Sequence, residues 1–521
     1  MVMAALSMDE AGRYDQGRLT LHVVWTAVVA AFGGLMFGYD IGISGGVTAM
    51  DDFLTLFFPR LLRRKNQAHE SDYCKFDDHT LQLFTSSLYL AAMAATLVAA
   101  HVTRKQGRVR SILLAGAFFI LGVIFNFASV HVAMLIVGRM LLGLGVGFAN
   151  QAVPLYLSEV APARWRGAMN IGFQLSVTIG ILVANLVNYF TQNIHPWGWR
   201  LSLGLAGIPA TVIFLAGLTL SDTPNSILER GLASGDGDVE DAAEKQAYEV
   251  LCKIRGIPDV HAELHAMKQA SQASQAVQSP WRAMWKKNKP QLAVTVALQV
   301  FQQLTGINAI MFYAPVLFQT VGFKSDAALY SAAITGGINV LSTLVSVALV
   351  DRLGRRKLLL EGSVQMLVAQ VAIGVLLGTS LKAGQEPSGV VAIWIIVLTC
   401  VFVPGFAWSW GPMGWLIPSE IFPLESRPAG QSVAVLVNML FTFLIAQAFL
   451  SMLCAMRFAI YFFFAAWVLV MGIAAFFLLP ETKGLPIEDV DSVWRNHRVW
   501  RTLLPPLTEA EARQQHMRQI M

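Results

Sequence analysis

Long apolar runs recur along the chain and are separated by short polar stretches. A helix that spans a bilayer needs about 20 predominantly apolar residues. Twelve segments meet this requirement, beginning near Leu21, Leu81, Ser111, Val132, Ala168, Leu201, Leu292, Ala327, Leu358, Val390, Ser432 and Ala455. The pattern therefore predicts an all-α membrane protein with twelve transmembrane helices.

A polar stretch of mixed charge divides these segments into two sets of six. It contains runs of helix-forming residues at 242–252 and 262–276, preceded by a glycine-rich break at 235–237. We expect an N-terminal tail (1–20), a six-helix bundle (21–220) with a long loop at 51–79, a helical linker domain (221–289), a second six-helix bundle (290–480) and a C-terminal tail (481–521).

Composition agrees with this class, because 55% of the residues are hydrophobic, 14% are charged and the mean hydropathy is +0.55. Such a chain is too apolar for a soluble globule. The net charge of +5 does not predict nucleic-acid binding, since the basic residues cluster beside the membrane segments. The first segment is too long and too rich in glycine for a cleaved signal peptide.

The distribution of basic residues predicts the orientation. Basic residues cluster after even-numbered segments, at 104–110, 164–166 and 352–357. By the positive-inside rule, both termini and the linker are cytoplasmic, and the loop at 51–79 is extracellular. This loop is too long for a plain connector, and loops of this length usually have a function, such as that of a lid, or are disordered.

An ionisable residue interrupts the first apolar segment. Asp40 lies in a glycine-rich stretch, and placing an acid in the centre of a membrane helix costs about 2.5–3.5 kcal/mol on insertion scales. Arg139, early in the fourth segment, is the candidate partner. The pair is a candidate functional site, and the alternative is an ion pair with a purely structural role.

Three side-chain amides interrupt the seventh segment. Gln302, Gln303 and Asn308 surround Gly306 within an otherwise apolar run. Burying an unpaired amide costs roughly 2–7 kcal/mol, so we expect these groups to face a wet cavity or a polar ligand such as a sugar. Gly306 and Pro315 allow the helix to bend there, as binding-site helices of transporters do. The alternative is that the amides only join neighbouring helices.

The two halves repeat a set of short motifs. Glu159 precedes Arg166 by the same spacing as Glu420 precedes Arg427. The stretch 104–108 resembles 351–355, which contains Asp351 and Arg355, and 222–224 resembles 481–483. All of these motifs follow or end even-numbered segments, which predicts two pseudo-symmetric bundles with gating motifs on the cytoplasmic side.

Together these motifs resemble the sugar-porter branch of the major facilitator superfamily over nearly the whole chain. Within that branch, the stretches 37–40, 103–108, 302–308 and 410–415, together with Cys74, resemble the plant sugar transport proteins, which are monosaccharide–proton symporters. Arg104 stands where the wider superfamily usually has an acid, and this plant group shares that departure.

The resemblance implies a major facilitator fold and import of monosaccharides, namely hexoses such as glucose and related sugars, across the plasma membrane. It implies a hexose site built from Gln174, Gln302, Gln303, Asn308, Asn339, Trp415 and Asn438, with Phe37 and Ile41 lining it from the first segment. Asp40 would carry the proton, and its release from Arg139 would let the first helix move around the sugar. Protons would be the coupling ion, and no cofactor or metal is expected.

Other functions remain open at this stage. They are a proton-coupled polyol or inositol carrier, a hexose facilitator without proton coupling, and a membrane sugar sensor. An enzyme is not expected, because the membrane segments contain no histidine pair, Cys–His pair or phosphate loop. The sequence leaves the oligomeric state undetermined.

Four cysteines allow one extracellular pairing. The predicted topology places Cys74 in the lid and Cys454 in the turn between the eleventh and twelfth segments, both outside, whereas Cys252 and Cys400 fall in the cytoplasm and the membrane. Disulfides persist in oxidising surroundings, so we expect a Cys74–Cys454 bridge, with two free thiols as the alternative. The resembling family carries such a bridge and lid.

Overall fold

The computed structural model describes residues 20–66, 74, 78–162, 166–257, 259–276, 280–320, 325–381, 389–423, 426–483, 494–495 and 497–502. Within these ranges the regular elements are helices, and no strand occurs. Eleven of the helical spans are long and apolar enough to cross a membrane, and a bent pair of helices provides a twelfth. The protein is therefore a multi-pass, all-α membrane protein, as the apolar pattern predicts.

The first six spans form one bundle. They are α2 (Leu21–Ala49), α5 (His79–Gln106), α6 (Arg108–Phe127), α7 (Val132–Val160), α8 (Arg166–Thr191) and the consecutive helices α9 (Gly198–Leu205) and α10 (Gly207–Gly217). Side-chain N-caps stabilise the start of two of these helices. Thr20 accepts a hydrogen bond from Val23 N at the start of α2, and Asp78 accepts hydrogen bonds from Thr80 N and Leu81 N at the start of α5.

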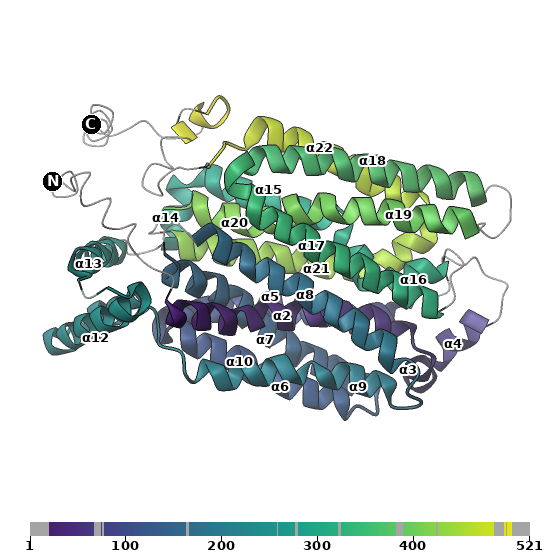
Figure 1. Ribbon diagram of the computed structural model, residues 1–521, viewed down its shortest axis with the longest axis horizontal. Coiled ribbons are helices and arrows are strands. Elements are labelled where there is room, and N and C mark those ends of the chain that lie inside the picture. The colour runs from purple at the N-terminus through teal and green to yellow at the C-terminus, as the bar shows by residue number, and fades with distance from the viewer. Residues whose placement is uncertain are drawn as a thin grey trace.

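The last six spans form the second bundle. They are α15 (Lys289–Leu304) with α16 (Ile307–Thr320), α17 (Ser325–Leu353), α18 (Arg355–Leu381), α19 (Gly389–Gly405) continued by η3 (Phe406–Trp410) and α20 (Gly411–Ile421), then α21 (Arg427–Met456) and α22 (Ala459–Leu478). A short η5 (Trp500–Thr502) follows. Figure 1 shows the two bundles side by side, the first in purple and blue, the second in green and yellow.

The seventh span is broken at the predicted place. Helices α15 and α16 meet at an angle of 44°. Gly306 lies in the break with φ +83°, a backbone conformation that favours glycine. A second irregularity follows at Tyr313, whose φ of −122° is not helical, two residues before Pro315.

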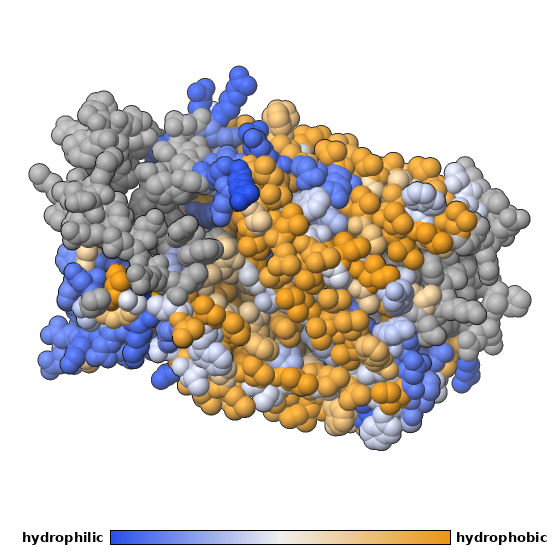
Figure 2. All heavy atoms as spheres, in the orientation of Figure 1, coloured by the Kyte–Doolittle hydropathy of each residue, from blue (hydrophilic) through white to orange (hydrophobic). Residues whose placement is uncertain are grey.

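Shorter helices mark the two ends of the bundles. Helices α11 (Pro224–Ser234), α12 (Gly237–Arg255), α13 (His261–Ala276) and α14 (Pro280–Lys287) form the linker between the halves. We call the end where α12, α13 and α14 lie the linker face, and the opposite end, where α3 (Asp51–Phe57) and α4 (Pro59–Asn66) lie, the lid face (Figure 1). Figure 2 shows apolar side chains covering the band between these ends.

Two sequence expectations need adjustment at the last turn between spans. The twelfth segment begins at Ala459 and not near Ala455, because α21 continues to Met456 and the chain turns at Arg457. Cys454 therefore lies in the last turn of α21 and not in a loop. The hydrophobic pattern could not locate this boundary, since both helices are apolar up to it.

Candidate functional site

A buried ion pair joins α2 to α7 in the first bundle. Asp40 Oδ1 lies 2.5 Å from Arg139 Nη1, and the two side chains are 2% and 0% exposed. Arg139 also donates to Ser44 Oγ and, at 3.1 Å, to the carbonyl oxygen of Phe84 on α5, whose ring lies 4.7 Å from the guanidinium carbon. Asp40 Oδ2 is buried and has no hydrogen-bond partner among the described residues. The sequence-predicted partners are thus in direct contact, with one carboxylate oxygen unused.

A cluster of amides lies in the second bundle. Gln302 Nε2 donates to the carbonyl oxygens of Trp410 and Gly411, at 3.1 and 2.9 Å. Asn438 Nδ2 on α21 donates to Gln302 Oε1 at 2.7 Å. The structure therefore brings two predicted sugar ligands, Gln302 and Asn438, into contact. They lie beside the stretch 410–415, which contains the predicted ligand Trp415.

The cluster contains a residue that sequence reasoning missed. Gln299 is fully buried, accepts from Asn438 Nδ2 at 2.7 Å and donates to the carbonyl oxygen of Gly414 at 2.6 Å. The available signal was its spacing, because Gln299 lies three residues before Gln302 and thus on the same helix face.

The remaining predicted sugar ligands are distributed around this cluster. Asn308 donates to Gln303 Oε1 across the break between α15 and α16. Asn339 on α17 is buried, and its Oδ1 has no partner among the described residues. Trp415, Phe37 and Ile41 are buried and Gln174 is half-buried, without a described hydrogen bond from their side chains to the cluster. In this structure the amides bond mainly to one another and to backbone carbonyls, so their expected exposure to a cavity stays a prediction.

Neutral hydrogen bonds join the two halves at both ends. Near the lid face, Gln82 donates to Ser451 at 3.0 Å and Ser86 donates to Gln447 at 2.6 Å. Near the linker face, Gln151 donates to Ser432 and Asn170 donates to Ser419, each at 3.1 Å. The central region is therefore bordered on both sides by contacts between the halves.

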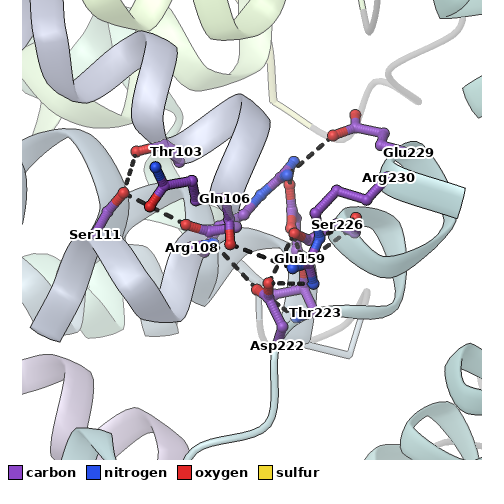
Figure 3. Close-up of polar contacts among 11 residues, drawn as sticks. Thr103, Gln106, Arg108, Ser111, Glu159, Asp222, Thr223, Ser226, Glu229 and Arg230 are labelled. Atoms are coloured by element: carbon purple, nitrogen blue, oxygen red, sulfur yellow. Dashed lines mark hydrogen bonds and ion pairs between the residues drawn. The ribbon is translucent and has the colours of Figure 1, made fainter. Parts of the chain in front are cut away.

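A charge network occupies the linker face of the first bundle (Figure 3). Arg108, the first residue of α6, lies 2.8 Å from Glu159 on α7 and 2.9 Å from Glu229 on α11. Thr223 donates to the second oxygen of Glu159. Asp222 accepts from the backbone N–H of Arg108 at 3.1 Å and pairs with Arg230 at 2.7 Å. An acid at a helix N-terminus also interacts favourably with the helix dipole.

The second bundle repeats this network. Arg355, the first residue of α18, lies 2.7 Å from Glu420 on α20 and 3.0 Å from Asp351. Thr482 donates to Glu420, and Glu481 accepts from the backbone N–H of Arg355 at 2.9 Å. The motif repeats thus correspond to equivalent contacts, but each network lies within one half and its adjoining segment.

The glycine before each arginine is required by this arrangement. Gly107 and Gly354 have φ of +99° and +90°. A Cβ on Gly107 would lie 1.9 Å from Asp222 Oδ2, and one on Gly354 would lie 2.7 Å from Glu481 Oε2. Glycine adopts this backbone conformation without strain, and because it has no Cβ it leaves room for the neighbouring carboxylate.

The other members of the predicted gating set are less informative. Arg427 donates to the carbonyl oxygen of Phe422 at 3.3 Å, and Arg166 begins α8, but its side chain lies outside the part that the structure describes. The partners of Glu159 and Glu420 are the arginines that begin α6 and α18. Sequence reasoning placed these arginines in repeated motifs without assigning the contacts, and it missed Glu229.

The lid face carries the expected disulfide. Cys74 is bonded to Cys454, which links the loop after α2 to the end of α21 across 380 residues of sequence. Cys252 and Cys400 form no disulfide. Asp52 on α3 lies 2.6 Å from His195, in the turn before α9, so the lid also contacts the first bundle.

Comparison with known proteins identifies the family. Residues 26–494 match the model of the family described as "Sugar (and other) transporter". The chain belongs to this sugar transporter family. It is 58% identical to sugar transport protein MST4 of Oryza sativa subsp. japonica over 96% of this chain and 95% of that protein. It is 52% identical to sugar transport protein 7 of Arabidopsis thaliana over 97% of this chain and 96% of that protein.

Solved structures show the same fold. A structure of the major facilitator superfamily proton:xylose symporter XylE bound to 6-bromo-6-deoxy-D-glucose has a TM-score of 0.76, at 24% identity, and covers 91% of this chain and 99% of that chain. An inward-open structure of XylE from E. coli has a TM-score of 0.69 at 23% identity over 91% and 100% of the chains. The sugar transporter family and the major facilitator fold place this chain among transporters and not among enzymes.

Proposed function

We propose that this chain imports monosaccharides, with hexoses as the main substrates, by proton symport across the plasma membrane. The linker face and both termini would be cytoplasmic, and the lid face extracellular. The names of the plant relatives support sugar as the substrate. The observation that carries proton coupling is the fully buried Asp40–Arg139 pair with its unused carboxylate oxygen.

Protonation of Asp40 would change how α2 is held. The charged carboxylate pairs with Arg139, whereas a neutral carboxyl loses most of that attraction in a low-dielectric interior. Arg139 would keep its bonds to Ser44 Oγ and to the Phe84 carbonyl, so the arginine itself stays compensated. Asp40 Oδ2 is the atom that would take the proton. A membrane potential supplies about 2.3 kcal/mol per charge per 100 mV for uphill import.

Sugar recognition would use the amide cluster. Amides donate and accept at once, as neighbouring sugar hydroxyls require, and Trp415 would lie against the apolar C–H face of the ring. Gln303, Asn308 and Asn339 bond to fewer described partners than Gln302 does, so they would contact the sugar with the least rearrangement.

The halves would rock about this site in alternating access. The hydrogen bonds near the linker face would break for release to the cytoplasm, and those near the lid face would break for uptake. The coupling ion is the proton, and the proposal requires no cofactor.

Transport tests separate this proposal from its alternatives. In yeast that lacks hexose transport, the wild-type chain should accumulate glucose in a way that a protonophore abolishes. Accumulation of inositol without glucose would favour the polyol carrier. Equilibration without accumulation would favour a facilitator, and absence of uptake at the plasma membrane would favour a sensor.

Asp40→Asn tests the coupling residue. The variant should lose accumulation against a gradient but keep sugar exchange between the two sides, because the sugar site remains. Glu361→Gln is the matched control, since Glu361 is an exposed acid within α18 that pairs with the Trp408 indole. A variant at position 40 that still concentrates sugar would refute the coupling role.

A further inference from the structure

A large pocket opens at the linker face, away from the amide cluster. Its volume is about 930 Å³, and its walls come from α5, α7 and α11 of the first half and its linker, and from α14 and α21 on the other side. The cross-half pair Gln151 and Ser432 forms part of its wall. Neither the proton pair nor the predicted sugar ligands line it.

The pocket has an excess of positive charge at its mouth. His101, Arg104 and Lys105 line it from the last two turns of α5 and are exposed. Arg104 and Lys105 form no ion pair with any described residue, whereas Arg108 is paired with Glu229 and Arg230 with Asp222. Arg104 and Lys105 are therefore uncompensated cationic donors that suit an anion such as a phosphate.

An apolar side chain continues the basic wall of the pocket along α5 toward the middle of the membrane span. Leu97, one turn before His101, lines the pocket and is 53% exposed on a helix that crosses the membrane. The pocket thus joins a basic end to an apolar side that lipid would cover.

Helix α14 forms the rim and has the composition of an interfacial helix. Met284 is fully buried, while Trp281 and Trp285 are 42% and 61% exposed and Lys286 is exposed beside them. Trp281 also lines the pocket. Tryptophans of membrane proteins concentrate at the depth of the lipid headgroups, and lysines there face anionic lipids. This places the basic mouth of the pocket at headgroup depth.

We propose that this pocket binds an anionic phospholipid, with its phosphate between Arg104 and Lys105 and an acyl chain along Leu97. The lipid would contact both halves, because its pocket is lined by both.

Native mass spectrometry of the purified full-length protein tests this site. Phosphatidylglycerol should be retained more tightly than phosphatidylcholine with the same acyl chains. Each basic residue near an anionic headgroup contributes about fivefold in affinity, so Arg104→Gln with Lys105→Gln should weaken phosphatidylglycerol binding roughly thirty-fold. Arg110→Gln with Lys357→Gln removes the same charge from exposed positions on the linker face outside the pocket and should change it little.

Four results would overturn the proposal. They are equal retention of both lipids, an equal loss in the two double variants, no loss in the pocket variant, and glycerol 3-phosphate binding as tightly as the lipid, which would assign the pocket to a soluble phosphate. Melting curves of both variants without lipid check that they are folded. Because binding is the measured quantity, the outcome does not depend on which sugar or ion the protein transports.

Discussion

Replacing Arg108 should destabilise the protein about twice as much as replacing its counterpart Arg355. In Arg108→Gln, the hydrogen bond from the Thr223 hydroxyl would be the one described partner left to Glu159. Water could not replace the lost guanidinium, because the Glu159 side chain is only 10% exposed. Removing one partner of a buried ion pair costs about 3–5 kcal/mol, because the other charge is left uncompensated. In Arg355→Gln the remaining acids, Glu420 and Asp351, are 24% and 60% exposed, so water would screen them and we expect roughly half that cost.

A double-mutant cycle separates the ion pair from packing. Glu159→Gln should cost less than Arg108→Gln, since Arg108 keeps Glu229 at 2.9 Å. The combined variant removes the stranded acid, so its cost should be smaller than the sum of the two single costs by about 1–3 kcal/mol, a coupling typical of residues in contact.

Denaturant titration of the purified full-length protein, followed by tryptophan fluorescence, measures these differences. Arg110→Gln is the control, because Arg110 is exposed one half-turn along the same helix and should change the unfolding free energy by about 0.5 kcal/mol at most. The reasoning is refuted if Arg108→Gln behaves like this control, or if Arg355→Gln costs as much as Arg108→Gln. Additive costs in the cycle would refute the contact itself.

Two further predictions concern transport. Asn308→Ala should raise the apparent Michaelis constant for glucose uptake about tenfold or more, because a site that bonds hydroxyls leaves partners unpaired when one amide is lost; an unchanged constant would place the sugar elsewhere. Cys74→Ser should weaken uptake chiefly at higher external pH if the lid keeps Asp40 protonated, with Cys400→Ser, which removes a free thiol, as the control. Equal loss at all external pH values would contradict this role of the lid.

The overall fold was accessible from the sequence because bilayer thickness fixes the length of each span. The break at Gly306 was predictable for a related reason, since three amides and a glycine interrupt one apolar run. The end of α21 was not, because apolar residues continue through Met456 and only the backbone at Arg457 marks the turn. Hydropathy detects where a helix can lie in lipid but not where the chain reverses.

The partners of charged residues were harder to predict. Arg139 is a predictable partner for Asp40, because it lies inside the fourth span and is followed by glycines that permit close helix approach. Arg108 contacts Glu159 and Glu229, which are 51 and 121 residues away, and many acids near the linker face were equally eligible. The repeat of 222–224 at 481–483 contained the relevant information, because Asp222 and Glu481 occupy equivalent positions beside the glycines that precede α6 and α18.

The distribution of strong and weak contacts suits a molecule whose halves move as units. Each charge network binds helices within one half and its adjoining segment, where breaking an ion pair would cost several kcal/mol. The described contacts between halves at the linker face are neutral, as in Gln151–Ser432 and Asn170–Ser419. A neutral hydrogen bond contributes only about 0.5–1.5 kcal/mol net, and water replaces it when a face opens. The linker face can therefore open without disturbing either network, whereas the Cys74–Cys454 bond keeps the lid attached to the second half as the lid face opens.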